Sequence, residues 1–303
     1  MRQTATDVLV IGGGIVGLMT AWYLAEDGAA VTLVEAGEIG AAASGANAGS
    51  IHLQIQYPEF VAYGEGWARA YAPCLRFLTA SLQLWQDLPG RVGEDLDVKL
   101  AGGLVVATEA GQMRQIEAKA RIEASAGVET AILDRDALRD MAPYLSHRAI
   151  GAGFCAMEGK ANPLRATPAI AVAAEAAGAV LMRGIEVTAI ERDGAGFRVR
   201  HAGGEIRAGR VVNAAGAAAG RIAAMLGVTL TIDGFPLQVT VTEPIAPLIP
   251  HLVYSAAGKL TLKQVANGGC IIGGGWSADI RPDGTLASNP ANLAANMGIA
   301  IDV

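Results

Sequence analysis

The chain has 303 residues, a formal net charge of −6 and only 17% charged residues. This length is enough for about two average domains with a large buried core. Lysine and arginine are scattered rather than clustered, so the sequence lacks the concentrated positive surface that nucleic acids require. The composition excludes a disordered or fibrous chain and predicts a globular protein with no nucleic-acid partner.

The three cysteines, Cys74, Cys155 and Cys270, lie far apart in the sequence. They show neither the spacing of a zinc site nor a disulfide framework. We therefore expect that the protein binds no metal ion and is located in the reducing cytoplasm. The few residues before the first expected strand leave no room for a secretory signal. Mean hydropathy is high at +0.35, but the apolar stretch 167–182 is interrupted by Glu175. We therefore expect no membrane span.

The chain begins with one βαβ unit. A buried strand is expected over residues 7–11, a helix over 15–26 and a second strand over 30–35, with a glycine turn between the first two. The segment 37–50 that follows is small and glycine-rich, which is typical of a loop that wraps a ligand.

Large apolar side chains then recur at helical spacing between Trp67 and Trp85, which predicts a long amphipathic helix, kinked or begun at Pro73. Later elements follow from periodicity and turn residues. In chain order they are strand 98–108, helix 109–126, strand 128–133, helix 163–177, strands 180–183, 186–192, 197–201 and 210–213, and strands 237–242, 259–265 and 270–274.

This order of elements predicts an α/β fold with two domains interleaved along the sequence. Residues 1–90 and 159–228 are expected to form a Rossmann-type dinucleotide-binding domain. Residues 91–158 and 229–303 are expected to form a mixed-sheet α+β substrate domain.

The strongest motif is a G-x-G-x-x-G turn made by Gly12, Gly14 and Gly17, with Glu35 at the end of the next strand. In such a turn the first glycine makes the bend, the second lets backbone approach a pyrophosphate, and the third allows close helix packing. The helix N-terminus attracts the phosphates, and the acidic residue accepts from ribose hydroxyls. A structural glycine turn would leave Glu35 unexplained, so we predict dinucleotide binding.

Two further segments narrow the choice of dinucleotide. Residues 40–49 read GAAASGANAG, and residues 211–216 read VVNAAG. With the ANP of residues 161–163 and the glycine-rich 268–274, they resemble the D-amino-acid oxidase, glycine oxidase and sarcosine oxidase superfamily of FAD-dependent oxidoreductases. The resemblance spans nearly the whole chain and implies FAD as the cofactor.

The resemblance also implies which residues contact FAD. Ser44, Asn47, Ala48 and Gly49 would line the flavin side, and Val187 would meet the adenine side through its backbone. Some relatives tether the flavin through a histidine where this chain has Ala46, so noncovalent binding is expected. The full set of expected cofactor contacts is Gly12, Gly14, Ile15, Val16, Gly17, Glu35, Ala36, Ser44, Asn47, Ala48, Gly49, Val187, Ala214, Ala215 and Gly216.

The implied reaction is oxidation of the C–N bond of an amino acid or secondary amine by hydride transfer to flavin N5. His52 follows the flavin loop and is a candidate to orient the substrate, although a structural histidine explains it equally well. Lys263 and Gln264 lie on a strand that covers the flavin in the family, and alternation on a strand lets only one face the site. A solvated Lys263 is the plainer alternative. His147, His201 and His251 are expected at the surface.

Family members usually continue beyond the point where this sequence stops, while here Asn289 and Pro290 only begin a helix. We therefore also consider a truncated flavoprotein, or a subunit whose partner completes the site in a hetero-oligomer. An NAD-dependent dehydrogenase is a third reading, although no nicotinamide-side catalytic motif stands out. No arginine can be assigned to a substrate carboxylate from the sequence.

Overall fold

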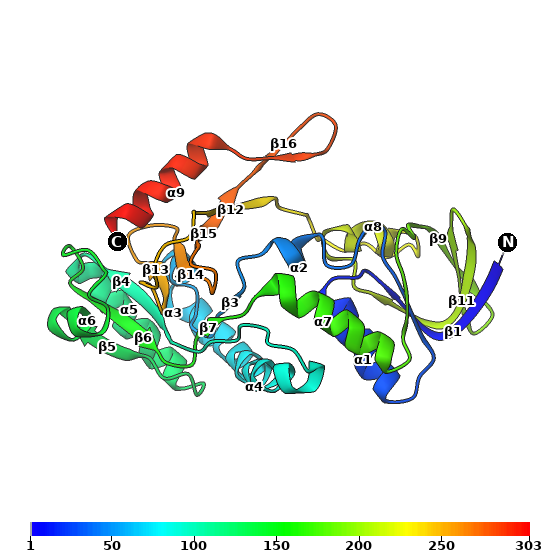
Figure 1. The fold of residues 1–303 in the computed structure, drawn as a ribbon, viewed down its shortest axis with the longest axis horizontal. Coiled ribbons are helices and arrows are strands. Elements are labelled where there is room, and N and C mark those ends of the chain that lie inside the picture. The colour runs from blue at the N-terminus through cyan, green and yellow to red at the C-terminus, as the bar shows by residue number, and fades with distance from the viewer. Residues whose placement is uncertain (1) are drawn as a thin grey trace. The chain divides into compact units, whose positions relative to one another are not determined.

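The computed structural model describes residues 2–303, which form two compact units (Figure 1). The first, called the nucleotide unit, contains the chain up to Asn47 together with Gly90–Leu96 and Pro163–Phe235. The second, called the mixed-sheet unit, contains Ala48–Pro89, Asp97–Asn162 and Pro236–Val303. Both units draw on segments that are far apart in the sequence.

The nucleotide unit is built on a six-stranded sheet in the order β8-β2-β1-β11-β10-β9. Strand β1 pairs in parallel with both β2 and β11, whereas β9, β10 and β11 form an antiparallel meander. The centre of β1, Val8–Ile11, is at most 5% exposed, as expected of a parallel strand covered on both faces. The strands are β1 (Arg2–Ile11), β2 (Val31–Val34), β8 (Val180–Met182), β9 (Val187–Asp193), β10 (Gly196–His201) and β11 (Gly204–Asn213).

Helices cover this sheet, and the crossover from β1 to β2 runs through the first of them. Helix α1 begins directly after the glycine turn and packs against α7. The remaining helices are short. The helical elements are α1 (Ile15–Glu26), α2 (Ala43–Ala46), α7 (Pro163–Ala176), η2 (Gly216–Ala218) and α8 (Ala219–Ala224).

The mixed-sheet unit has a seven-stranded sheet in the order β12-β15-β14-β13-β4-β6-β5. Only β13 and β4 pair in parallel, and the other neighbours are antiparallel. The strands are β4 (Gly103–Ala107), β5 (Ala131–Asp134), β6 (Gly151–Cys155), β12 (Leu237–Val241), β13 (Leu252–Ser255), β14 (Thr261–Gln264) and β15 (Cys270–Ser277).

Two small ribbons and several helices complete this unit. The ribbon β3–β7 pairs Ser50 with Lys160 and Ile51 with Gly159. The elements are β3 (Ser50–Ile51), β7 (Gly159–Lys160), β16 (Asp279–Ile280), β17 (Leu286–Ala287), α3 (Tyr57–Tyr71), η1 (Ala72–Cys74), α4 (Leu75–Val92), α5 (Ala110–Ala124), α6 (Arg135–Met141) and α9 (Pro290–Asp302).

Most predicted elements are found, including the predicted break at Pro73. The predicted long helix is two helices, α3 and α4, separated by a 3-10 turn that contains Pro73. Helix α9 begins after Asn289, whose side chain accepts from the Asn292 N–H as an N-cap. Strands β6 and β13 were not predicted, because both are short and buried and show no alternation.

The predicted boundary at residue 90 differs from the observed division. Residues 48–89 lie in the mixed-sheet unit rather than in the nucleotide unit. Leu53, Phe60 and Leu75 share a buried cluster with Ile122 and Cys155 of that unit, so the apolar faces of α3 and α4 belong to its core. The amphipathic pattern showed that these helices bury one face, but not against which sheet.

Within residues 2–303, no helix is long and apolar enough to cross a membrane. Over the same residues, no group of three or more His, Cys, Asp or Glu side chains is arranged to hold a metal ion.

Candidate cofactor and substrate sites

The glycine turn in the nucleotide unit has no room for side chains at two of its three motif positions. Gly12 has a φ of 113°, and a Cβ there would lie 2.4 Å from the Ala214 carbonyl oxygen. A Cβ on Gly17 would lie 1.9 Å from the Gly12 carbonyl oxygen. At Gly14, by contrast, a Cβ would meet only the Ser44 side chain, whose hydroxyl lies at 3.0 Å. The side of the turn at Gly14 is therefore shaped for close approach of a ligand to the backbone.

Glu35 lies against this turn. Its carboxylate accepts from the Gly13 N–H at 2.7 Å and from the Gly37 N–H at 2.8 Å. The acidic side chain is thus held beside the start of α1, where it can accept from the ribose hydroxyls of a dinucleotide. These contacts place the predicted acid and the predicted turn together.

Replacing Glu35 by Gln should weaken FAD binding roughly tenfold or more, because hydrogen bonds to an ionised group contribute about 1.5–3 kcal/mol each. The measurement is a fluorescence titration of apoprotein with FAD. Glu38→Gln is the matched control, since Glu38 is exposed in the same loop. Equal FAD affinities for the two variants would show that Glu35 does not contact the cofactor.

Ser44 lies at the N-terminus of α1. Its hydroxyl oxygen accepts from the Ile15 N–H at 3.0 Å, and it is the nearest side chain to Gly14. Phosphates bind at helix N-termini, so Ser44 lies beside the helix end that would receive a pyrophosphate. Asn47 donates to the Ala43 and Ser44 carbonyls at 3.0 and 2.7 Å, which closes the short helix α2. Ala48 and Gly49 follow in the mixed-sheet unit.

The other predicted cofactor contacts lie in three places: at the end of β11 beside the turn, in the sheet core, and at exposed positions near the turn. The Ala214 N–H donates to the Ile11 carbonyl at 2.9 Å, so the end of β11 lies beside the turn. Ala215 and Gly216 lead from there into η2. Val187 is only 3% exposed and packs in the core cluster of the nucleotide unit. Val16 is 66% exposed, and Ala36 lies in the exposed loop after β2.

A second group of predicted residues meets in the mixed-sheet unit. Lys263 on β14 donates to the Ser50 hydroxyl on β3, and its side chain is 1% exposed. The His52 Nδ1 atom forms a hydrogen bond with the Tyr254 hydroxyl on β13. The alternative of a solvated Lys263 is wrong, because the residue is buried.

Burial keeps this group low in charge. Burial first, and then the nearby charge of Lys263, lower the pKa of His52 to about 4. The pKa of Lys263 is lowered to about 7, first by burial and then by the charge of Lys160. At neutral pH His52 is therefore neutral, and Lys263 titrates near pH 7.

The low pKa of Lys263 makes stability depend on pH in a defined direction. Below about pH 7 the lysine is charged in both folded and unfolded states, so the full penalty of burying the charge is present. As pH rises towards the ordinary pKa of 10.5, only the unfolded state keeps the proton. The wild type should therefore gain stability relative to Lys263→Met, by up to about 1.4 kcal/mol per pH unit. Urea unfolding of both proteins at pH 6.5 and 9.5 measures this, and a constant difference would contradict it.

The Gln264 side chain forms hydrogen bonds with the loop of residues 246–249. Its side-chain oxygen accepts from the Leu248 and Ile249 N–H groups at 2.6 and 3.0 Å, and its amide donates to the Ala246 carbonyl at 2.9 Å. The two neighbours on β14 thus differ, and Lys263 is the one that donates to Ser50 and whose charge acts on His52.

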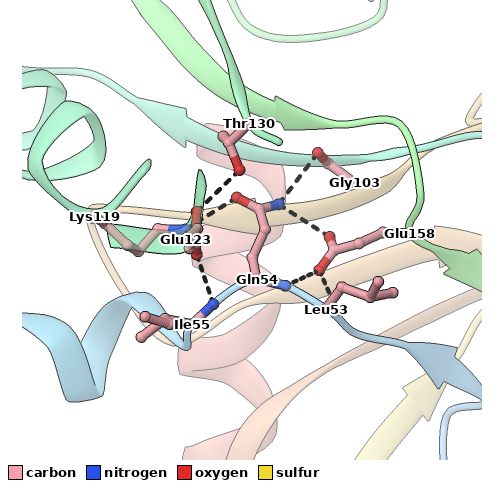
Figure 2. Close-up of polar contacts among 8 residues, drawn as sticks. All are labelled: Leu53, Gln54, Ile55, Gly103, Lys119, Glu123, Thr130 and Glu158. Carbon is pink, nitrogen blue, oxygen red and sulfur yellow. Dashed lines mark hydrogen bonds and ion pairs between the residues drawn. The ribbon is translucent and has the colours of Figure 1, made fainter. Parts of the chain in front are cut away.

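A buried polar network around Gln54 was not predicted (Figure 2). Lys119 and Glu123 on α5 form an ion pair of 2.6 Å with both side chains fully buried. Lys119 also donates to the Gln54 side-chain oxygen at 3.1 Å, and Gln54 donates to Glu158 at 3.0 Å. The spacing of Lys119 and Glu123 predicts an ion pair on a helix, but nothing in the sequence showed that this face is buried.

The three histidines expected at the surface differ in their environments. His147 is exposed and His201 is half-buried. His251 is only 8% exposed and shares a 2.7 Å hydrogen bond with the Tyr144 hydroxyl, so that prediction is wrong for His251. Its place directly before β13 buries it against Phe154.

The sheet, the glycine turn and the acid beside it define a dinucleotide-binding protein of the Rossmann type. Residues 7–301 match the model of the DAO family, described as FAD dependent oxidoreductase. The chain belongs to this family, and it is an FAD-dependent oxidoreductase. This result confirms the predicted superfamily and cofactor and decides for FAD over NAD.

Relatives of known function cover most of the chain. One of the subunits of opine oxidase from Agrobacterium tumefaciens (strain Ach5) is 28% identical over 90% of this chain and 71% of its own length. Glycine oxidase of Geobacillus kaustophilus (strain HTA426) is 28% identical over 86% of this chain and 68% of its own. The crystal structure of L-proline dehydrogenase from P. horikoshii superposes with a TM-score of 0.81 at 26% identity, over 98% of this chain and 77% of that one.

Proposed function

We propose that this protein oxidises the C–N bond of an amino acid or secondary amine. FAD, when bound, supplies the hydride acceptor. The substrate loses a hydride from the carbon beside nitrogen and becomes an imine, which water hydrolyses to a carbonyl compound and an amine or ammonia. Similarity to proteins named opine oxidase, sarcosine oxidase and glycine oxidase supports this choice.

The observation that carries the proposal is the group formed by His52, Lys263, Ser50 and Tyr254. An amine gives up a hydride readily only when its nitrogen is uncharged. A site with a strong positive charge would repel a substrate that arrives in its ammonium form. Burial lowers the pKa of both nitrogen bases here, so the site offers hydrogen-bonding groups with little fixed positive charge. His52 and Lys263 are the proposed substrate-facing side chains.

The cofactor is proposed to be held noncovalently. Gly14 and the N-terminus of α1 would receive the pyrophosphate, and Glu35 would receive the ribose hydroxyls of the adenosine. Ser44 would lie near the phosphates, and Ala48 and Gly49 would follow along the flavin. The alanine at position 46 offers no nucleophile or imidazole for a covalent link.

We also propose that this protein assembles with a second, different chain into a hetero-oligomer. Several of the relatives are named as subunits, among them subunits of opine oxidase and of sarcosine oxidase. A partner chain would then complete the substrate site or accept electrons from the flavin. Co-purification of a second polypeptide with the tagged chain from its own host tests this point.

The test of function is anaerobic reduction of the flavin. The purified protein should show the visible absorption of oxidised flavin, and a reactive amine should bleach it without oxygen. The panel contains glycine, sarcosine, L-proline, an opine and glycerol 3-phosphate, because other similar proteins are named glycerol-3-phosphate dehydrogenases. Bleaching by glycerol 3-phosphate alone would overturn the proposal, and recolouring by air would identify an oxidase.

A further inference from the structure

The carboxyl group of Glu158 holds the backbone directly after His52. Its Oε1 atom accepts from the Leu53 and Gln54 N–H groups, both at 2.8 Å (Figure 2). The Leu53 N–H belongs to the peptide bond that joins His52 to Leu53, so Glu158 fixes the orientation of that peptide. A backbone N–H can only donate, which makes Oε1 the acceptor whether or not the other oxygen of Glu158 carries a proton.

The two residues after Glu158 hold the backbone before His52. In the ribbon β3–β7 they pair with Ser50 and Ile51. His52 itself belongs to no strand, so its position follows from the bonds made by its neighbours on each side. The segment 158–160 therefore fixes the backbone both before and after His52.

The place of Glu158 is itself fixed by close packing. Its side chain is fully buried, and a Cβ at Gly103 would lie 1.8 Å from Oε2, so only glycine leaves room for the carboxyl group. A Cβ at Gly159 would lie 2.1 Å from the Lys99 carbonyl oxygen. Lys99 and Lys160 also exchange two backbone hydrogen bonds, of 2.8 and 3.0 Å. The segment that carries the carboxyl group thus has little room to shift.

Loss of this carboxyl group would leave two backbone donors without their acceptor. Leu53 and Gln54 are both buried, and a buried donor without a partner is costly. The backbone should therefore move until these N–H groups meet water or another acceptor. Because Leu53 follows His52 directly, that movement would draw the imidazole away from the Tyr254 hydroxyl, with which its Nδ1 atom forms a hydrogen bond.

We propose that Glu158 is a positioning residue, which holds His52 beside Tyr254 and so keeps the imidazole in place for the substrate. The inference rests on the proposed function, in which His52 faces the substrate. Glu158 acts through the backbone of residues 53 and 54 and does not itself need to touch the substrate.

The first test follows the imidazole without any substrate. The Cε1 protons of the 4 histidines are recorded by NMR between pH 8 and pH 5, and His52→Gln identifies the signal of His52 by its loss. In the wild type His52 should remain neutral over this range, because burial and then the charge of Lys263 lower its pKa to about 4.

Glu158→Met fills the space of the side chain but offers no acceptor to the two N–H groups. The pKa of His52 should then rise towards its ordinary value of 6.5 as the ring meets water. Loss of the negative charge of Glu158 would by itself lower the pKa of a nearby histidine, so a rise reports movement of the ring. An unchanged pKa of His52 in this variant overturns the proposal.

Two further variants separate positioning from other effects. Glu158→Asp keeps the carboxyl group but withdraws it by one methylene group, so the pKa of His52 should rise here too. This variant decides if Glu158→Met does not fold. Leu138→Ala is the control for general loss of stability, because Leu138 is buried in a separate core cluster of the same unit. It should leave His52 unchanged, and a rise as large as in Glu158→Met overturns the proposal.

Flavin reduction then tests the role in the reaction. At saturating amine, Glu158→Met should slow anaerobic reduction roughly 10- to 100-fold, because small displacements of a substrate-facing group are costly. Its FAD content should match the wild type, since the glycine turn and Glu35 lie in the nucleotide unit. An unchanged rate would overturn the positioning role. A raised pKa of His52 in a protein that oxidises no amine would refute the proposed function and leave the link between Glu158 and His52 intact.

Discussion

Gly17→Ala should yield a protein that is purified without bound FAD. The new methyl group would lie 1.9 Å from the Gly12 carbonyl oxygen and 3.4 Å from the Ala214 Cβ. The first of these contacts is with backbone that no rotamer change can move aside. Helix α1 would have to shift away from the turn, and the N–H groups at its start would lose their place around the pyrophosphate.

The comparison that isolates this effect is Gly66→Ala. Gly66 also lies in a helix, α3, but a Cβ there meets no atom within 4 Å. The same substitution should therefore leave FAD binding intact and stabilise the fold by about 0.5–1 kcal/mol, as Ala replaces Gly in an open helix position. Flavin absorbance per protein and the urea midpoint of both variants are the readouts. Stoichiometric FAD in Gly17→Ala would show that the close approach is not required.

The nucleotide site could be predicted because its parts are local in the sequence. The glycines at 12, 14 and 17 and the acid at 35 lie within one βαβ unit, and the conformational demands of such a turn restrict the residue types. The sequence could not show that Ser44 folds back onto the N–H of Ile15, because a small-residue loop has no periodic pattern that fixes its path.

The group around His52 could be predicted only in part. His52 and Lys263 were recognised as candidates, but Tyr254 is 202 residues from His52 and Glu158 is 105 residues from Leu53. Contacts over such separations depend on how β13, β7 and the β3 strand meet, and strand β13 itself was not predicted. Buried polar residues also look like surface residues in a sequence, since most of their kind are exposed.

Lys119→Met should be the most damaging single change in the mixed-sheet unit, with a loss of about 3–5 kcal/mol in the free energy of unfolding. The methionine fills a similar volume, but Glu123 would remain buried with a charge and no cation beside it. Glu123 also holds the Ile55 N–H at 2.6 Å and the Thr130 hydroxyl at 2.9 Å, so it cannot turn away to solvent without breaking these bonds.

Arg69→Met provides the control, because Arg69 and Glu65 form an ion pair with the same four-residue helical spacing in which both side chains are more than half exposed. Its loss should cost about 0.3–0.5 kcal/mol, and added salt should reduce even that difference. Salt should leave the cost of Lys119→Met nearly unchanged, since buried charges are screened weakly. Urea unfolding at low and high salt measures all four values. Equal costs for the two variants would mean that Lys119 stabilises the unit no more than a surface lysine does.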